Sequence, residues 1–274
     1  MSRKIVHLSD LHFSWVDEAL IDPLVRCVCE IAPAILTVSG DFVQHAWPNE
    51  FESAAALLAR LPGRQILVPG NHDMAFLNPV RRITQRLRLF RKYITPDPQP
   101  FYRDDEIAIM GLNTARVEHL RGGRIRDWQV DLLEERMSAV PAGLIRVLVT
   151  HHPFDLPETF HAREIVARGS QAIERVVKCV DLLLAGHMHI SHAGPTAERY
   201  KAAGHSAVFV QAGTAISTRS RGEANGFQVI ETGPASIEVQ TFMWESERSS
   251  YLPYALSRFK RSASGWARVI AERE

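Results

Sequence analysis

Five short hydrophobic runs along the chain end abruptly at a polar residue whose side chain can bind a metal ion. The runs are continuous rather than alternating, which is typical of central strands that are covered on both faces. They are Lys4 to Ser9 before Asp10, Ala34 to Gly40 before Asp41, Gln65 to Gly70 before Asn71, Ile145 to Thr150 before His151, and Asp181 to Gly186 before His187. The pattern predicts five strands, each ending at a candidate ligand.

Segments that look helical separate these runs. They cover Asp17 to Ile31, Asn49 to Arg60, Pro79 to Lys92, Asp127 to Val140 and Ser170 to Cys179. Strands that alternate with helices predict a layered α/β fold. Because ligands gather at the carboxyl ends of the strands in open sheets of this kind, we expect the five polar residues to share one site.

Glycine precedes three of the five polar residues, at Gly40, Gly70 and Gly186. At such points the chain turns sharply off a strand and often adopts dihedrals that penalise a Cβ. One glycine of this kind is typical of any β–α turn. Three of them, each followed by Asp, Asn or His, favour a common site.

The second half of the chain contains shorter runs, at residues 206–213, 225–232 and 236–244, with turn signals at Asn225-Gly226 and around Gly233-Pro234. These runs predict a second set of strands that is partly connected by hairpins. Residues 102–113 suggest another hairpin, with Asp104 and Asp105 near its turn. We expect two packed sheets flanked by helices, forming one domain over residues 1–248.

Residues 249–274 are rich in Ser and Arg, with scattered aromatic side chains. We expect them to form a C-terminal tail or extension. Three arrangements remain open for it: it covers the core, contacts another subunit or stays loose.

Composition narrows the class of protein but not its reaction. Of 274 residues, 46% are hydrophobic and 23% are charged, as in ordinary soluble enzymes. The net charge of +1 does not favour nucleic acid or a membrane as a partner, and no apolar run approaches the roughly 20 residues that span a bilayer. The three cysteines (Cys27, Cys29 and Cys179) are an odd, sparse set, and we expect Cys27 and Cys29 to be small buried hydrophobes rather than metal ligands or a redox pair.

The sparse cysteines fit a reducing compartment. The first strand also lies so close to the N-terminus that a cleavable signal would remove residues that look catalytic. We therefore expect the mature protein to begin near residue 1 and to be cytoplasmic.

The candidate ligands mix carboxylate, amide and imidazole groups. They are Asp10, His12, Asp41, Asn71, His151, His187 and His189. This set suits borderline divalent metals such as Mn, Fe or Zn. Seven ligands are too many for one catalytic ion with an open position, but they suit two ions that share a bridging carboxylate. In an extended chain residues two apart point to the same side, so we expect Asp10 with His12, and His187 with His189, to act as local pairs.

Each ligand also has a simpler explanation. Asp10 and Asp41 could be helix N-caps, and Asn71 could be a turn residue. A single His beside a strand end is usually structural. These explanations account for one residue each and not for the joint pattern.

The motifs resemble those of the calcineurin-like metallophosphoesterase superfamily. The blocks are Asp-Leu-His (10–12), Gly-Asp (40–41), Gly-Asn-His-Asp (70–73), His-His-Pro (151–153) and Gly-His-Met-His (186–189), in the family's order. The resemblance covers residues 1 to about 215. It implies a four-layer αββα sandwich of two mixed β-sheets between helices, and a centre of two divalent metal ions.

The resemblance also implies a role for each matching residue. Asp10, His12 and His189 would bind the first ion, Asp41 would bridge both ions, and Asn71, His151 and His187 would complete the second. His72 would be the catalytic group beside the substrate, with an electrostatic or general-acid role, and Asn71 would also face the substrate. Asp73 would orient His72 or cap the next turn.

These charges suit an anionic substrate. Two dications, the carboxylates of Asp10 and Asp41 and one hydroxide leave about +1, which attracts a phosphate without holding its product tightly. A bound metal lowers the pKa of water to about 7, so hydroxide becomes available near neutral pH.

The expected reaction is metal-dependent hydrolysis of a phosphodiester, with a small nucleotide or cyclic nucleotide as substrate. Leu112-Asn113-Thr114 and Gly123-Arg124-Ile125 resemble the bacterial class III cyclic nucleotide phosphodiesterase branch. His72, where another branch has Arg, argues against cleavage of lipid A precursors. The alternatives are a metal-dependent nuclease, a phosphomonoesterase or a non-catalytic metal-binding scaffold. The sequence does not reveal the oligomeric state.

Two further features bear on the substrate. Phe42-Val43-Gln44-His45 departs from the family's usual polar residue after Gly-Asp, which puts one outer contact in doubt. The basic segment 81–92 contains six Arg or Lys and no acidic residue. It is either a solvated helix face or a basic wall near the Asn71–His72 loop that receives an anionic substrate or a nucleic-acid backbone.

The remaining histidines fall into three groups. His152 lines the site or packs beside Pro153. Three are possible neighbours of the substrate, namely His45, His161 and His192. Three have no expected role, namely His7, His119 and His205.

Overall fold

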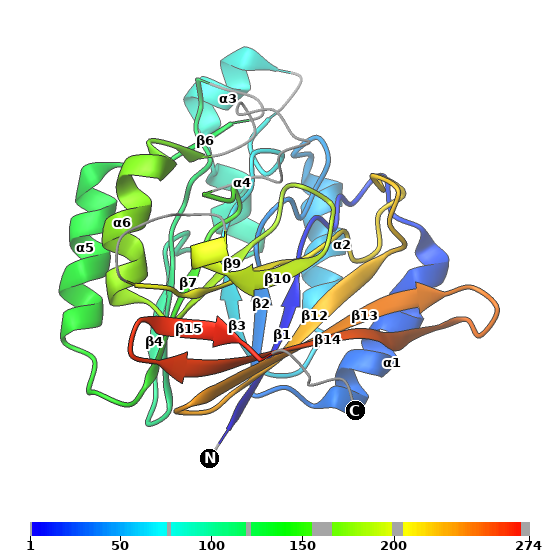
Figure 1. Cartoon of the computed structure of the whole chain (residues 1–274). Coiled ribbons are helices and arrows are strands. Elements are labelled where there is room, and N and C mark those ends of the chain that lie inside the picture. Colours follow the sequence, from blue (N-terminus) through cyan, green and yellow to red (C-terminus); the bar gives the residue numbers. More distant parts are fainter. Residues whose placement is uncertain (1, 76–77, 119–121, 155–165, 199–204, 270–274) are drawn as a thin grey trace.

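Two mixed β-sheets pack face to face between two layers of helices in the computed structural model (Figure 1). The structure describes residues 2–75, 78–118, 122–154, 166–198 and 205–269. The α/β class and the four-layer arrangement predicted from the sequence are therefore confirmed. The described residues include no helix that is long and apolar enough to cross a membrane.

The first sheet has seven strands in the order β15-β14-β13-β12-β1-β2-β3. Three parallel strands carry the N-terminal motifs, and they are β1 (Arg3–Leu8), β2 (Ile35–Val38) and β3 (Arg64–Leu67). The antiparallel part consists of β12 (Gly226–Thr232), β13 (Ser236–Glu245), β14 (Ser250–Ser262) and β15 (Gly265–Arg268). Its helix layer includes α1 (Ile21–Ile31), which follows the short helix η1 (Glu18–Leu20), α2 (Pro48–Leu58) and α4 (Arg88–Tyr93).

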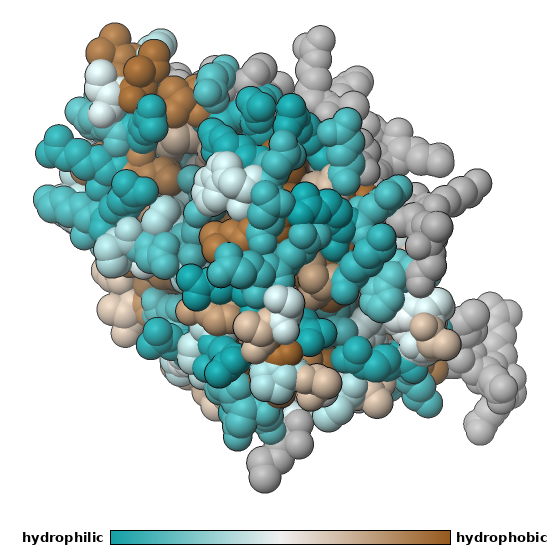
Figure 2. All heavy atoms as spheres, turned by 90° about the vertical axis from the view of Figure 1, so that its left-hand side faces the viewer, coloured by the Kyte–Doolittle hydropathy of each residue, from teal (hydrophilic) through white to brown (hydrophobic). Residues whose placement is uncertain are grey.

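The second sheet has six strands in the order β10-β11-β9-β7-β5-β4. They are β4 (Phe101–Arg103), β5 (Ile107–Gly111), β7 (Ile145–Val149), β9 (Leu182–Ala185), β10 (His192–Pro195), which the short helix η3 (Thr196–Glu198) follows, and β11 (Val208–Gln211). Helices α5 (Asp127–Ser138) and α6 (Gly169–Cys179) cover its outer face. The surface on that side of the molecule is mostly hydrophilic (Figure 2). A separate pair of short parallel strands, β6 (Gly123–Arg124) and β8 (Val166–Ala167), lies before α5 and α6.

Continuous hydrophobic strands supply both faces of each sheet. In β1, Ile5 packs between the two sheets, whereas Val6 packs against the helices. In β7, Val147 lies between the sheets and Leu148 faces the layer of α5 and α6. Because side chains alternate along a strand, an unbroken apolar run is what a central strand of a four-layer fold requires.

The chain beyond residue 248 forms β14 and β15, which pair with β13 and with each other. Tyr251, Phe259 and Trp266 are buried in the core, and the indole N–H of Trp266 donates to Asp181. Of the three arrangements open for this segment, residues 250–268 therefore cover the core. The boundary at residue 248 remains a proposal about domain organisation.

The helix expected from Pro79 to Lys92 is two helices, α3 (Pro79–Gln85) and α4. The chain breaks at Arg86, whose φ is 41°. The break lets Leu87 and Phe90 enter the core under α2 while Arg82 turns toward the loop after β3. Among the cysteines, Cys27 and Cys179 are half-buried but Cys29 is exposed, so the prediction of a buried residue is wrong there.

Candidate metal centre

The loops that follow β1, β2, β3, β7 and β9 meet at one place between the two sheets. The backbone joins them directly, since the Asp10 amide donates to the Gly40 carbonyl (3.1 Å) and the Gly186 amide donates to the His151 carbonyl (3.0 Å). All seven candidate ligands lie here with at most 7% of their surface exposed. The strand ends therefore converge as the sequence predicts.

Five of these residues have a left-handed backbone. They are Asp10, His12, Asp41, His187 and His189, with φ between 48° and 72°. Each such residue costs about 1–3 kcal/mol, and strain of this kind clusters at functional sites. The expectation of extended local pairs is therefore wrong in its geometry. Asp10 and His12 do meet, but His187 and His189 point to different partners.

The first group of donors contains Asp10, His12 and His189. The Nε2 atoms of His12 and His189 lie 3.2 Å apart. Oδ1 of Asp10 lies 3.2 Å from His189 Nε2 and 3.6 Å from His12 Nε2.

The second group contains Asn71, His151 and His187. Nε2 of His151 lies 3.1 Å from Oδ1 of Asn71 and 3.2 Å from Nδ1 of His187. His152 is a near neighbour, because its ring centre is 4.6 Å from that of His187.

Asp41 stands between the two groups. Its Oδ2 atom lies 3.6 Å from His12 Nε2 and 3.3 Å from His151 Nε2. Its Oδ1 atom accepts a hydrogen bond from the His72 amide (2.8 Å), which fixes the carboxylate. One oxygen of Asp41 is therefore shared by the two donor groups.

These distances fit bound ions. Two ligands about 2.1 Å from one ion at tetrahedral or octahedral angles are about 3.0–3.4 Å apart, which is close to the spacing seen here. The Nδ1–H groups of His151 and His189 face the carbonyls of Ser39 and Arg219, so each Nε2 carries a free lone pair in the neutral ring. Such a hydrogen bond behind the ring is usual for metal-binding histidines.

Burial and charge set the protonation of the donors. Burial opposes ionisation of Asp10 and Asp41, but neighbouring histidines hold the pKa of both carboxyls well below the usual range. Burial lowers the pKa of His12 and His187. For His151 burial acts in the same direction, but the charge of Asp41 outweighs it and raises the pKa to about 9. A metal must therefore displace a proton from His151 at neutral pH.

The three glycines are required for different reasons. Gly40 has a φ of 97°, as the sequence predicts. Gly70 and Gly186 are needed for close approach instead, because an added Cβ would lie 2.1 Å from Oδ1 of Asp41 and 1.8 Å from Oγ of Ser9, respectively. That Ser9 hydroxyl donates to Oδ2 of Asp10 (2.6 Å), so Gly186 makes room for the support of a ligand.

Asp73 connects two loops that carry ligands. Its carboxylate accepts hydrogen bonds from the amides of Phe42, Val43 and Gly70 at 2.8–3.2 Å. Asp73 therefore joins the loop after β2 to the loop after β3, and this keeps Asp41 and Asn71 in register.

His72 lies at the edge of the donor cluster. Its Nδ1 atom faces the carbonyl of Gln44 (2.9 Å), and its Nε2 atom faces Nη1 of Arg219 (3.1 Å). Burial lowers the pKa of His72 to about 4, so the ring is neutral near pH 7 without substrate. The side-chain carbonyl of Gln44 also accepts a hydrogen bond from Arg219 (3.3 Å).

Arg219 was not among the residues expected at this site. It lies in the loop between β11 and β12, which crosses from one sheet to the other, and no motif marks that loop. Arg82 was expected only as part of a basic segment. It is 3% exposed, and its guanidinium donates to the carbonyls of Asn71 (3.1 Å) and Arg116 (2.9 Å). Arg82 thus holds the loop of a candidate ligand, whereas Arg86, Arg88, Arg91 and Lys92 are exposed.

The other histidines differ in whether they lie beside the donor cluster. His152 is buried beside the site, and its Nδ1 is 2.9 Å from the hydroxyl of Thr114. His7, for which no role was expected, lies behind the site. Its Nε2 is 2.8 Å from the hydroxyl of Ser39, and the carbonyl of Ser39 faces Nδ1 of His151. His45 pairs with Glu50, His192 lies on β10 and His205 is half-buried before β11. His119 and His161 lie outside the described residues.

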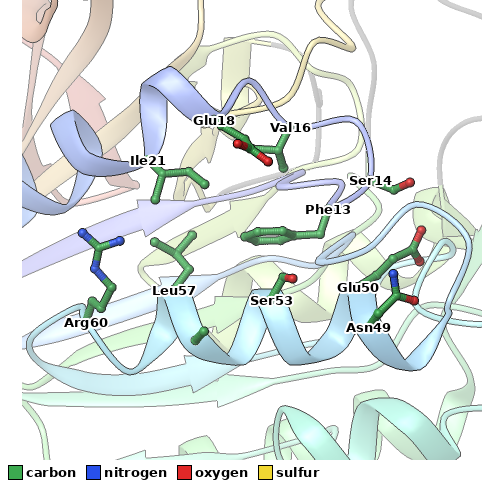
Figure 3. A pocket seen from close by; sticks show the side chains of 11 residues that line it. Phe13, Ser14, Val16, Glu18, Ile21, Asn49, Glu50, Ser53, Leu57 and Arg60 are labelled. Carbon is green, nitrogen blue, oxygen red and sulfur yellow. The ribbon is translucent and has the colours of Figure 1, made fainter.

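A cavity of about 450 Å³ lies beside the loop that follows the ligand His12 (Figure 3). Its lining comes from this loop, from η1 and the start of α1, and from α2 and the residues just after it, with Phe13 and Leu57 pointing into it. None of the seven candidate ligands lines this cavity.

The model of the calcineurin-like phosphoesterase family matches residues 3–191, and the chain belongs to this family. The donor cluster described above accordingly contains groups of His and Asp that could hold metal ions. A search among curated proteins gives no significant match.

Solved structures share the fold at low identity. The structure of PhoD is 10% identical, with a TM-score of 0.71 over 99% of this chain and 72% of that chain. Purple acid phosphatase PPD1 from yellow lupin (Lupinus luteus) seeds is 10% identical, with a TM-score of 0.67 over 94% and 53%. Vacuolar protein sorting 29 from Cryptosporidium parvum is 13% identical, with a TM-score of 0.52 over 94% and 98%. This chain thus spans about half the length of the lupin phosphatase, and the likeness concerns the fold alone.

Proposed function

We propose that the protein is a phosphodiesterase that uses two divalent metal ions and acts on a small nucleotide or cyclic nucleotide. The observation that carries the proposal is the single Asp41 oxygen shared by two donor groups, each completed by three further ligands. Asp10, His12 and His189 would hold one ion, and Asn71, His151 and His187 the other. Manganese, iron and zinc all suit these ligands.

When bound, the two ions would supply positive charge to the phosphoryl oxygens and activate a water molecule. The chain itself has to orient the substrate and neutralise the leaving group. His72 and Arg219 lie together at the edge of the donor cluster, where both can contact an anionic phosphoester. The neutral ring of His72 gains affinity for a proton when an anion binds beside it, which is the change that a general acid requires.

The assignment to the class III cyclic nucleotide phosphodiesterase branch is the narrowest part of the proposal. It is supported by the resemblance of the Leu112–Thr114 and Gly123–Ile125 segments to that branch. Both segments lie beside His152, because Thr114 contacts its ring and a Cβ at Gly123 would lie 2.4 Å from it.

The test uses metal-stripped protein reloaded separately with manganese, iron and zinc. Each form is assayed on a chromogenic phosphodiester, a chromogenic phosphomonoester and cyclic AMP. We expect metal-dependent diester hydrolysis that Asp41→Asn abolishes and that the exposed control Asp97→Asn retains. Cyclic AMP turnover in parallel would support the branch. Monoester turnover alone would contradict the diester specificity, and two bound ions without any turnover would contradict catalysis.

A further inference from the structure

Trp15 stands beside the donor cluster in an unusual position for a large apolar residue. It follows the ligand His12 by three positions, and its amide donates to the His12 carbonyl (2.8 Å). Its side chain nevertheless remains 45% exposed. Single exposed tryptophans are normal on protein surfaces, but this one is held in place by specific contacts.

The backbone of Trp15 is fixed by the loop between β11 and β12. The Trp15 carbonyl accepts hydrogen bonds from the Thr218 amide (2.8 Å), the Thr218 hydroxyl (3.0 Å) and the Ser217 hydroxyl (3.1 Å). Val16 and Ser217 also form an antiparallel bridge. The loop that carries His12 and the loop that carries Arg219 therefore form one unit.

Arg219 links the indole to the catalytic edge. Its guanidinium carbon lies 5.5 Å from the centre of the Trp15 ring, and its Nη1 atom lies 3.1 Å from Nε2 of His72. Its own carbonyl faces Nδ1 of the ligand His189. A fixed cation thus lies between the partly exposed indole and the place where a phosphoester would bind. The ring of His45 meets the indole at a steep angle, with the ring centres 6.0 Å apart.

We infer that Trp15 and Arg219 form a nucleotide subsite, in which the guanidinium contacts the phosphate and the indole stacks on the base. The inference rests on the proposed phosphodiesterase function and restricts its substrates to nucleotides. Aromatic side chains and guanidinium planes both stack on bases, and this contact accepts every base because every base has a π-face. The subsite therefore selects nucleotide esters over esters without a base and discriminates little among the bases.

Steady-state kinetics with two chromogenic diesters tests this subsite. One is thymidine 5′-(p-nitrophenyl phosphate), and the other is methyl p-nitrophenyl phosphate, which keeps the leaving group and lacks the nucleoside. For Trp15→Ala we expect KM for the nucleoside ester to rise about 5- to 100-fold, which is the range for loss of one stacked base. KM for the methyl ester should change much less, because that ester has no base to stack on the indole.

Two variants serve as controls. Trp15→Phe keeps an aromatic face and should retain most of the preference for the nucleoside ester. Trp128→Ala removes a tryptophan that is 50% exposed in the first turn of α5, and it should change neither substrate. An equal loss on both esters in Trp15→Ala would overturn the subsite, because it would indicate that Trp15 only supports the loop.

Binding provides a readout that does not need turnover. We expect AMP to bind the metal-loaded wild type more tightly than ribose 5-phosphate does in calorimetry, and the two to bind alike in Trp15→Ala. Equal affinities in the wild type would overturn the subsite even if diesters are hydrolysed. Absence of hydrolysis with a preserved preference for AMP would overturn the proposed phosphodiesterase function and leave the subsite standing.

Discussion

The donor cluster and its rim are built in different ways. The donor cluster consists of the seven candidate ligands, which are buried, strained at five positions and attached to strand ends. The rim consists of Trp15, Gln44, His72 and Arg219, which connect to one another through side chains and lie closer to solvent at Trp15 and Arg219. Strand ends position the cluster rigidly, whereas side-chain contacts between loops position the rim.

This difference separates metal binding from substrate selection. Removing a group from the cluster should change the number or affinity of bound ions. Removing a group from the rim should leave the ions in place and change how the substrate is bound or cleaved. The predictions below depend on this separation.

The largest effect expected from the rim is on turnover. His72→Ala should lower kcat by at least about 10²-fold, because loss of a general acid or a charge-stabilising group costs that much. Its metal content should remain that of the wild type. Turnover and metal analysis on the same sample would check this, with His192→Ala as a histidine control on β10. Wild-type turnover in His72→Ala would contradict the role proposed here.

A comparable effect on stability is expected where the basic segment touches the cluster. Arg82→Ala removes a buried guanidinium that donates to backbone carbonyls, including that of Asn71. We expect a loss of about 3 kcal/mol in the free energy of unfolding, because buried carbonyls lose charged donors. Urea denaturation would measure it.

Arg88→Ala is the matched control, since Arg88 is an exposed residue of the same basic segment. It should change stability by no more than about 0.5 kcal/mol. If Arg82→Ala lost as little stability as Arg88→Ala, the segment would act as a uniform solvated surface.

A smaller effect is expected from crowding the support of Asp10. Gly186→Ala places a Cβ against the Ser9 hydroxyl, and overpacking of this kind costs about 1–3 kcal/mol. Because Ser9 supports Asp10, affinity for the first ion should fall as well. Gly143→Ala is the control, because Gly143 has a φ of 96° and an added Cβ would meet no other atom within 4 Å. This variant should lose some stability without losing metal affinity. Metal titration of both variants would separate the two outcomes.

The last expected effect is on pH dependence, and it builds up gradually with pH. In the metal-free protein the pKa of His151 is raised to about 9, so the ring is protonated below that pH and neutral above it. Because the ligand must be neutral, affinity for the second ion should rise by up to about tenfold per pH unit from neutral pH to about 9, and then level off. Calorimetric titration in buffers of different ionisation enthalpy measures the protons released when the metal binds. We expect about one proton to be released near pH 7 and none near pH 10. A flat profile would contradict the raised pKa.

The parts of the molecule that the sequence predicts are those encoded locally. An apolar run, a glycine and a ligand follow one another within a few residues, and parallel pairing then brings the strand ends together. The break at Arg86 was not predictable in this way, because it depends on how Leu87, Phe90 and Arg82 pack against separate parts of the core.

Arg219 was missed for a topological reason. Strand β11 pairs parallel to β9, and β12 pairs antiparallel to β1, in the other sheet. The loop between them must therefore pass over the carboxyl ends where the ligands meet. No periodicity in residues 212–225 signals that passage, and an arginine in a polar loop looks like any surface residue.

The central claim is that Asp41 joins two metal sites in one centre. Its most direct test is the number of metal ions per chain, measured by mass spectrometry of native protein after stripping and reloading, for the wild type and Asp41→Asn. The account predicts two ions in the wild type and fewer than two in the variant. One ion in the wild type, or two in Asp41→Asn with unchanged affinity, would contradict a shared carboxylate.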